Sequence, residues 1–198
     1  MSRRKHDAYY TEQGLTLELL KYLSLDKYKT ILEPCVGDGH IRDVVQAKYP
    51  HLVYTTNDID TTKEADYHED ATEPFNWLYN SKDELYTDGL FTEEPKHWDC
   101  CITNFPYNVQ DQILPLVWEH VELLAFIPRL TWLEPTKTRA KFLEENKKHC
   151  RYQIIFNPRP KYDSKGTDNV TSMFIVYDKT YYGNPEQIYA IDWQDNKL

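Results

Sequence analysis

The sequence has no apolar stretch approaching the roughly 20 residues that a membrane-spanning helix requires. Its basic first residues are not followed by the apolar core of a secretion signal. Internal repeats, low-complexity tracts and linkers are also missing. These absences lead us to expect a single domain over residues 1–198 in a cytoplasmic protein, without membrane contact.

Metal-ligand spacing and excess positive charge are missing as well. The four cysteines follow no zinc-site pattern, and the adjacent Cys100 and Cys101 would point to opposite faces of a strand, so we expect reduced thiols and no bound metal. The formal net charge is -9. Because neutralisation of phosphates by Lys and Arg supplies most non-specific affinity for nucleic acids, this charge argues against indiscriminate binding to them. Local basic patches remain at residues 3–6 and 159–161.

What the sequence does contain is an alternation of strand and helix patterns. Helices are predicted over 14–24, around 41–45 and over 108–120 with a kink at Pro115. Charges that alternate in a helical manner predict a further helix over 135–148. Strands are predicted at 30–33, 52–56, 98–103, 121–127, 152–156 and 171–177, with a short one ending at Asp70. Residues 78–97 lack clear periodicity and predict a surface insertion.

This order predicts an α/β fold with a seven-stranded, mostly parallel sheet and helices on both faces. The last two predicted strands have no helix between them, so we expect the last strand to be antiparallel. Ligands of such sheets bind outside the carboxyl ends of the strands. The residues just after the predicted strands are therefore the candidates for function.

The first candidate is the run Glu-Pro-Cys-Val-Gly-Asp-Gly over residues 33–39, directly after a strand. Gly37 and Gly39 would allow a tight turn and the close approach of a ligand. Arg42 stands where a dinucleotide fingerprint has its third glycine, and no Walker-type Gly-Lys-Ser/Thr exists. An ordinary strand-to-helix turn is the alternative interpretation.

The second candidate is Asp58, which ends a strand about 20 residues beyond the glycine turn, where an acid can accept hydrogen bonds from both ribose hydroxyls. Ile59 beside it could pack on an adenine face. Taken alone, Asp58 could equally be a plain turn acid. Together with the glycine turn it favours an adenosine-containing ligand.

The third candidate is the tetrapeptide Asn104, Phe105, Pro106 and Tyr107 at the end of the fourth predicted strand, 98–103. An ordinary turn with a packed ring is one interpretation. The run also resembles the Asn/Asp-Pro-Pro-Tyr/Phe motif of class I S-adenosylmethionine-dependent amino-methyltransferases. The motif order along residues 9–177 is similar to that of Dam-like, type II restriction-modification and small phage-type DNA adenine methyltransferases, which have a Rossmann-like fold.

This resemblance implies S-adenosylmethionine as the cofactor. Thr11 would contact its methionine end, Asp58 its ribose, and Asp70 with Ala71 its adenine ring. The full set of implied cofactor residues is Tyr10, Thr11, Glu33, Pro34, Gly37, Gly39, Asp58, Ile59, Asp70, Ala71 and Asn104.

The chemistry gives a reason for the tetrapeptide. The lone pair of an exocyclic or amide nitrogen is delocalised, so two acceptors must hold its hydrogens and turn the lone pair toward the methyl donor. The Asn104 side-chain oxygen and the Phe105 carbonyl are the candidates, while Pro106 fixes the chain direction and the Tyr107 ring can stack on a planar substrate. Positioning and electrostatic fit would supply most of the acceleration, without a metal or a covalent intermediate.

For the acceptor, the resemblance favours adenine N6 in DNA, which an enzyme must flip out of the duplex. Arg159 and Lys161, in the loop over 157–168, are the expected substrate contacts, although a solvated hairpin connection is the other interpretation of this loop. Protein glutamine is an alternative acceptor that suits an acidic surface. A non-catalytic protein with the cofactor fold is the third hypothesis, because Phe105 and Glu12 stand where the family often has prolines.

Overall fold

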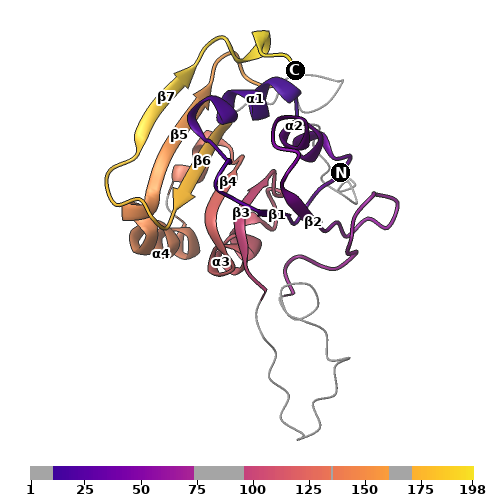
Figure 1. Cartoon of the computed structure of the whole chain (residues 1–198). Coiled ribbons are helices and arrows are strands. Elements are labelled where there is room, and N and C mark those ends of the chain that lie inside the picture. Colours follow the sequence, from indigo (N-terminus) through magenta and orange to yellow (C-terminus); the bar gives the residue numbers. More distant parts are fainter. Residues whose placement is uncertain (1–10, 74–95, 135, 161–170) are drawn as a thin grey trace, which may run out of the picture.

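One mixed sheet forms the centre of the computed structural model, which describes residues 11–73, 96–134, 136–160 and 171–198 (Figure 1). The sheet has seven strands in the order β2-β1-β3-β4-β6-β5-β7. Their bounds are Thr30–Glu33 (β1), Val53–Thr56 (β2), Trp98–Thr103 (β3), Val121–Phe126 (β4), Cys150–Phe156 (β5), Met173–Asp178 (β6) and Glu186–Ala190 (β7). The fold class and strand number expected from the sequence are confirmed.

The prediction of one antiparallel strand in an otherwise parallel sheet can be compared with the observed strand directions. Strands β1 to β4 pair in parallel, whereas β6 runs antiparallel to both of its neighbours, β4 and β5. The strand predicted over 171–177 is therefore the antiparallel one. Because β5 pairs with β6 on the other side, β5 returns to the common direction of the sheet.

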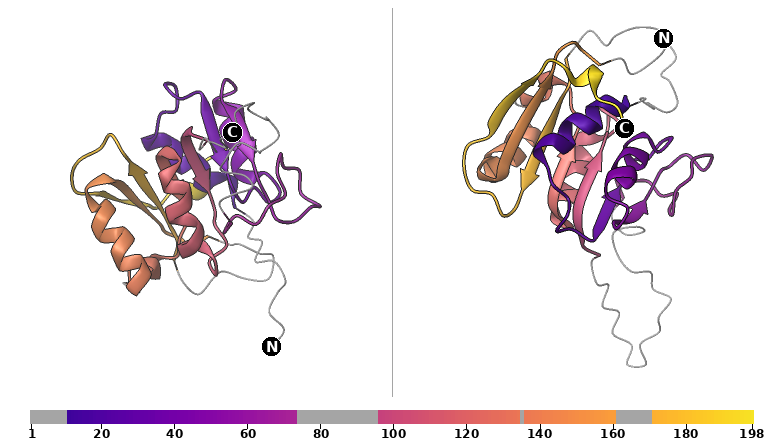
Figure 2. Two further views of the ribbon diagram at one scale, coloured as in Figure 1. Left: turned by 90° about the horizontal axis from the view of Figure 1, so that it is seen from below. Right: turned by 45° about the horizontal axis from the view of Figure 1, so that its top comes forward.

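Helices cover both faces of the sheet. Helices α1 (Gln13–Tyr22) and α2 (His40–Lys48) pack on one face, and α3 (Gln110–Glu119) and α4 (Lys137–Asn146) on the other. Figure 1 shows these two layers above and below the sheet, and the left view of Figure 2 shows α3 beside α4. The four predicted helices are confirmed, with ends that differ by about two residues. Pro115 lies inside α3.

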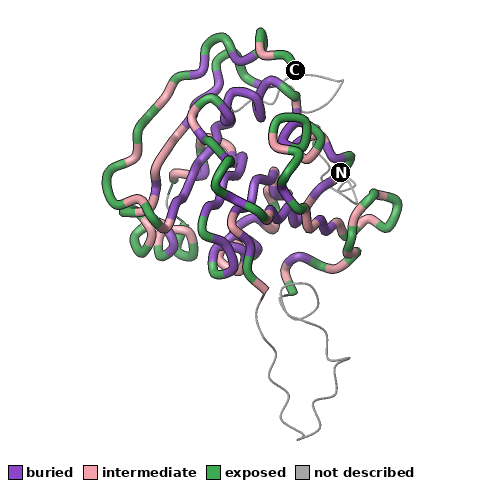
Figure 3. The backbone as a smooth tube through the Cα atoms, viewed as in Figure 1, coloured by how far each residue is buried: buried purple, intermediate pink, exposed green. Residues whose placement is uncertain are grey.

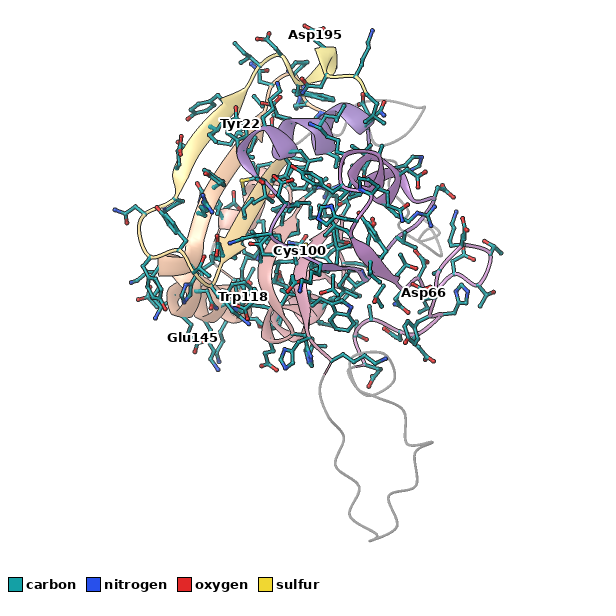
Figure 4. All side chains as sticks on the ribbon, in the orientation of Figure 1. Tyr22, Asp66, Cys100, Trp118, Glu145 and Asp195 are labelled. Atoms are coloured by element: carbon teal, nitrogen blue, oxygen red, sulfur yellow. The ribbon has the colours of Figure 1, made fainter. Side chains whose placement is uncertain are left out.

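Two buried clusters, one on each face, fill the space between these layers. The side chain of Cys100 belongs to the cluster under α1 and α2, and that of Cys101 to the cluster under α3 and α4. Their opposite directions are those expected of neighbours in a strand. Figure 4 places Cys100 near the middle of the sheet, and Figure 3 shows the central strands buried. The buried cysteines Cys100, Cys101 and Cys150 are free thiols, as expected.

The short strand predicted to end at Asp70 is wrong. Only one parallel bridge, between Asn57 and Tyr67, joins this segment to the end of β2. The Asp66 carboxylate accepts hydrogen bonds from the Thr56 amide (2.8 Å) and hydroxyl (2.8 Å), in the place of a backbone ladder. Side chains of this kind compete with strand pairing, so the segment remains a sequence of turns.

The seventh strand, β7, was not predicted. Only one of its five residues is buried, because it lies at the edge of the sheet and pairs in parallel with β5 alone. Its polar sequence shows no alternation of apolar and polar residues from which a strand could be predicted. The strand forms because its backbone pairs with that of β5. The predicted and observed sheets both have seven strands, but the predicted set includes a strand before Asp70 and the observed set has β7 instead. The insertion expected over 78–97 lies, apart from residues 96 and 97, outside the described residues.

Candidate cofactor and acceptor site

The carboxyl ends of β1, β2 and β3 meet at one edge of the sheet because the three strands are parallel neighbours. Strand β1 lies between the other two, so the chain order reverses there, and this is where open α/β sheets bind their ligands. In the register, Ile31 pairs with Cys100 and Leu32 with Cys101. Continued past the strand ends by the same offset, this register would bring Cys35, in the run before Gly37, opposite Asn104.

The glycine turn has the backbone that the sequence predicts. Gly37 and Gly39 have φ angles of 55° and 79°, and Gly39 is the N-cap residue of α2. A residue with a Cβ atom would be strained at these φ angles, which accounts for glycine at both positions. Apart from Gly37 and its two chain neighbours, no heavy atom of the described residues lies within 4 Å of the position a Cβ would take there. The turn is therefore open on this side to a ligand.

Asp58 lies directly against this turn. Its carboxylate accepts hydrogen bonds from the Gly37 amide (2.8 Å, Oδ2) and from the Asp60 amide (2.9 Å, Oδ1). Each oxygen keeps a further lone pair, so the half-buried carboxylate can still accept from two hydroxyls. Ile59 beside it is 53% exposed, as a side chain that packs on a ligand would be.

Asn57 is a residue of this site that sequence reasoning missed. Its buried side chain donates from Nδ2 to the carbonyls of Pro34 (3.1 Å) and Glu69 (3.1 Å), and its Oδ1 accepts from the Glu69 amide (2.9 Å). The residue thus ties the glycine turn, the end of β2 and the segment before Asp70 together. The signal available in the sequence was an asparagine at the end of a predicted strand, directly before Asp58.

Several carboxyl groups gather around the same turn. Burial raises the pKa of the Cys35 thiol, and the carboxylates of Asp58, Glu33 and Asp70 raise it further, in that order. The pKa of Glu33 is raised well above its usual range, chiefly by burial. The Oε2 atom of Glu33 has no hydrogen-bond partner among the described residues.

The segment predicted to meet an adenine ring is brought to the same edge. The exposed Asp70 uses Oδ1 to accept from the Thr72 amide (2.9 Å) and hydroxyl (2.7 Å), while Ala71 is buried. Ala71 belongs to the cluster that includes Leu32 and Phe105. The turn is thus anchored in the core by Ala71.

The tetrapeptide begins where β3 ends, and its first two side chains point to opposite faces of the sheet. Asn104 lies on the side of α1, where its Nδ2 donates to Thr11 Oγ1 over 3.3 Å. In this orientation Asn104 Oδ1 is buried and has no hydrogen-bond partner in the described chain. A buried acceptor of this kind is costly unless something binds it.

Phe105 points the other way, into the cluster under α3, where it is fully buried and packs against Phe126 with ring centroids 5.8 Å apart. The side chain that replaces the usual first proline is therefore a core residue. The carbonyl of Pro106 accepts from the Val109 amide (3.1 Å), which closes the turn before α3.

Tyr107 is half-buried, and the guanidinium carbon of Arg129 lies 4.6 Å from the centre of its ring. Sequence reasoning missed Arg129, although it follows the end of β4, the neighbour of β3. A basic residue just after a buried strand was the available signal.

The remaining predicted site residues are Arg159, Tyr10 and Lys161. Arg159 is exposed after β5, at the same edge of the sheet, but β6 separates β5 from β4. Tyr10 and Lys161 lie outside the described residues. Over the described ranges, no cluster of three potential metal ligands and no helix long and apolar enough to cross a membrane is found.

No family model matches the sequence, and no curated protein does. The solved structures that resemble the chain include a type I restriction-modification methyltransferase subunit from Streptococcus thermophilus (TM-score 0.63, 13% identity, 92% of this chain, 47% of that chain). A modification subunit of a putative type I restriction enzyme from Vibrio vulnificus YJ016 is similar (0.61, 13%, 91%, 46%). So is a putative RNA methyltransferase from Pyrococcus horikoshii (0.58, 13%, 90%, 91%).

The chain spans about half the length of the two restriction-modification subunits. At these identities the comparisons define the architecture of the domain. The chain has the Rossmann-like methyltransferase fold.

Proposed function

We propose that this protein transfers the methyl group of S-adenosylmethionine to an exocyclic amine, with adenine N6 in DNA as the acceptor. The observation that carries the proposal is Asn104 Oδ1, a buried acceptor left without a described partner at the carboxyl end of β3. An amine hydrogen is the group that such an oxygen would accept. The restriction-modification subunits of similar fold favour DNA as the acceptor.

The residues present fit the cofactor. Gly37 leaves open space where a side chain would be, Asp58 keeps lone pairs for ribose hydroxyls, and Ile59 is exposed beside them. Thr11, which would contact the methionine end of the cofactor, accepts a hydrogen bond from Asn104. When bound, S-adenosylmethionine would supply an electrophilic methyl group at this edge.

The chain's own residues would position the acceptor. Asn104 Oδ1 and the Phe105 carbonyl would take the two hydrogens of the amine, which turns its lone pair toward the cofactor. Pro106 holds the direction of the chain, and Tyr107 offers a ring to a flat acceptor. The nitrogen would become positively charged as it takes the methyl group and would then lose one proton to solvent. Two acceptors that hold its hydrogens would favour this positive charge.

Tritium transfer from labelled S-adenosylmethionine tests the proposal with unmethylated DNA, RNA and a protein fraction in parallel. Label in DNA, recovered as N6-methyladenine after digestion, is the expected result. Label in glutamine of the protein fraction would overturn DNA as the acceptor and favour the glutamine hypothesis. Binding of S-adenosylmethionine by calorimetry without any label would indicate a non-catalytic protein, and no binding would overturn the proposal altogether.

A further inference from the structure

Backbone contacts fix the position of Arg129. It forms an antiparallel bridge with Ser172, and the amide that follows it, of Leu130, donates to the Thr171 carbonyl (2.7 Å). Its own carbonyl accepts from the Trp132 amide (2.8 Å). The start of β6 and the short helix after β4 (Leu130–Leu133) therefore fix Arg129 from two sides.

The position of Tyr107 is fixed just as closely. Strands β3 and β4 are parallel neighbours, with Thr103 paired to Phe126, and the Ile127 amide donates to the Thr103 carbonyl (3.3 Å). Tyr107 and Arg129 thus follow strand ends that are bonded to each other. Their side chains meet with the guanidinium carbon 4.6 Å from the ring centre.

A guanidinium over an aromatic ring is attracted by the negative face of the ring, and it stays charged throughout the working pH range of proteins. It therefore occupies one face of Tyr107 and restricts the rotation of the ring. An acceptor that stacks on Tyr107 would therefore be expected on the face turned away from the guanidinium.

We propose that Arg129 is a positioning residue for the acceptor, acting through the ring of Tyr107. The inference rests on the proposed function, because it assigns Arg129 to the acceptor end of the same site. Its chemistry selects a planar, electron-rich acceptor such as a nucleobase, since the flexible side chain of a protein glutamine offers no ring to stack. The arginine matters by its flat shape as well as by its charge, so lysine should be a poor replacement.

A double-mutant cycle tests the inference in the full chain. Arg129→Met is expected to lower kcat/KM for DNA by about tenfold, and Arg129→Lys to recover only part of it, while the Kd for S-adenosylmethionine stays within about twofold. In a Tyr107→Leu background, Arg129→Met should have little further effect, because its partner is gone. Independent, multiplying losses would overturn the inference, as would wild-type kcat/KM in Arg129→Met.

Arg139→Met is the matched control. Arg139 also lies over a ring, that of Trp132 at 5.4 Å, but its guanidinium is bonded to Asp111 (2.9 Å) between α3 and α4. Its loss should lower Tm without changing the kcat/KM of the folded enzyme. If Arg129→Met instead lowered Tm and cofactor affinity together with activity, its role would be merely structural and the inference would fail.

A binding measurement tests the role of Arg129 independently of whether the protein methylates DNA. A single-stranded oligodeoxynucleotide carrying 2-aminopurine, an adenine analogue whose fluorescence falls on stacking, needs no methyl transfer to report. The unchanged protein should quench it, and Arg129→Met and Tyr107→Leu should each reduce the quenching. Quenching that persists in both variants, or is missing in the unchanged protein, overturns the inference, whether or not DNA is methylated.

Discussion

The side-chain amide of Asn104 donates to the hydroxyl of Thr11 over 3.3 Å, although the two residues are 93 positions apart in the chain. This bond directs Asn104 Oδ1 away from Thr11 and leaves it buried, without a partner in the described chain. The relationship joins the entry to α1 to the end of β3. It links the expected cofactor end of the site to its acceptor end.

Asn104→Ala should abolish methyl transfer, with kcat reduced by roughly 10²-fold or more, because the oxygen that holds the amine is lost. The Kd for S-adenosylmethionine should change little. Asn104→Asp keeps an acceptor and should retain more activity. Tritium transfer checks this order of activities, and the exposed Asn108→Ala serves as the control. Full activity in Asn104→Ala would remove the residue from the reaction.

Asp58→Ala should weaken cofactor binding, because a carboxylate bonded to the Gly37 amide loses both the turn contact and its ribose acceptors. A charged hydrogen bond contributes about 1.5–3 kcal/mol, so we expect the Kd to rise by roughly 10- to 100-fold. Calorimetry with S-adenosylmethionine measures the change. Asp26→Ala, which removes an exposed acid bonded to Ser24, should leave the Kd unaltered. Equal affinities in all three proteins would contradict the assignment of Asp58.

Asn57→Asp should destabilise the fold by about 2–3 kcal/mol, since a carboxylate cannot donate to the Pro34 and Glu69 carbonyls it would face. Cofactor affinity should fall with it, because the turn and the segment before Asp70 lose their common anchor. Urea denaturation and calorimetry measure the two effects. The same substitution at the exposed Asn108 provides the comparison. An unchanged stability would show that the three segments hold together without Asn57.

Glu33→Gln should change how stability depends on pH. Burial raises the pKa of Glu33, so the folded protein keeps this proton at pH values where the unfolded chain has lost it. Unfolding then releases a proton, and the wild-type free energy of unfolding falls as pH rises, by up to about 1.4 kcal/mol per pH unit. This fall begins at the ordinary pKa of a glutamate and ends at the raised pKa of the folded state.

Glutamine does not titrate, so the stability of Glu33→Gln relative to wild type should increase with pH over that window. Urea denaturation of both proteins at several pH values measures the difference. A difference that stays constant with pH would mean that Glu33 is ionised in the folded protein.

Local pattern predicted those parts of the fold that depend on near neighbours. The apolar spacing of Leu15 and Leu19 indicated α1, and the β-forming run ending at Thr103 indicated β3. Side-chain competition for the backbone of Thr56 removed the strand expected before Asp70, and β7 had no local signal. The first error concerns side-chain contacts between Thr56 and Asp66, which strand propensity does not describe. The second concerns an edge strand whose pairing is decided by its distant partner β5.

The same division holds for the site. The sequence by itself determined which chemistry is present: the glycines of the turn, Asp58, and an amide followed by a carbonyl, a proline and a ring at the end of a strand. Only the tertiary structure decided that Thr11 meets Asn104, that Asn57 joins three segments, and that Arg129 covers Tyr107. The physical reason is that residue type and spacing act within a few positions, whereas these contacts depend on which strands lie side by side and in what register.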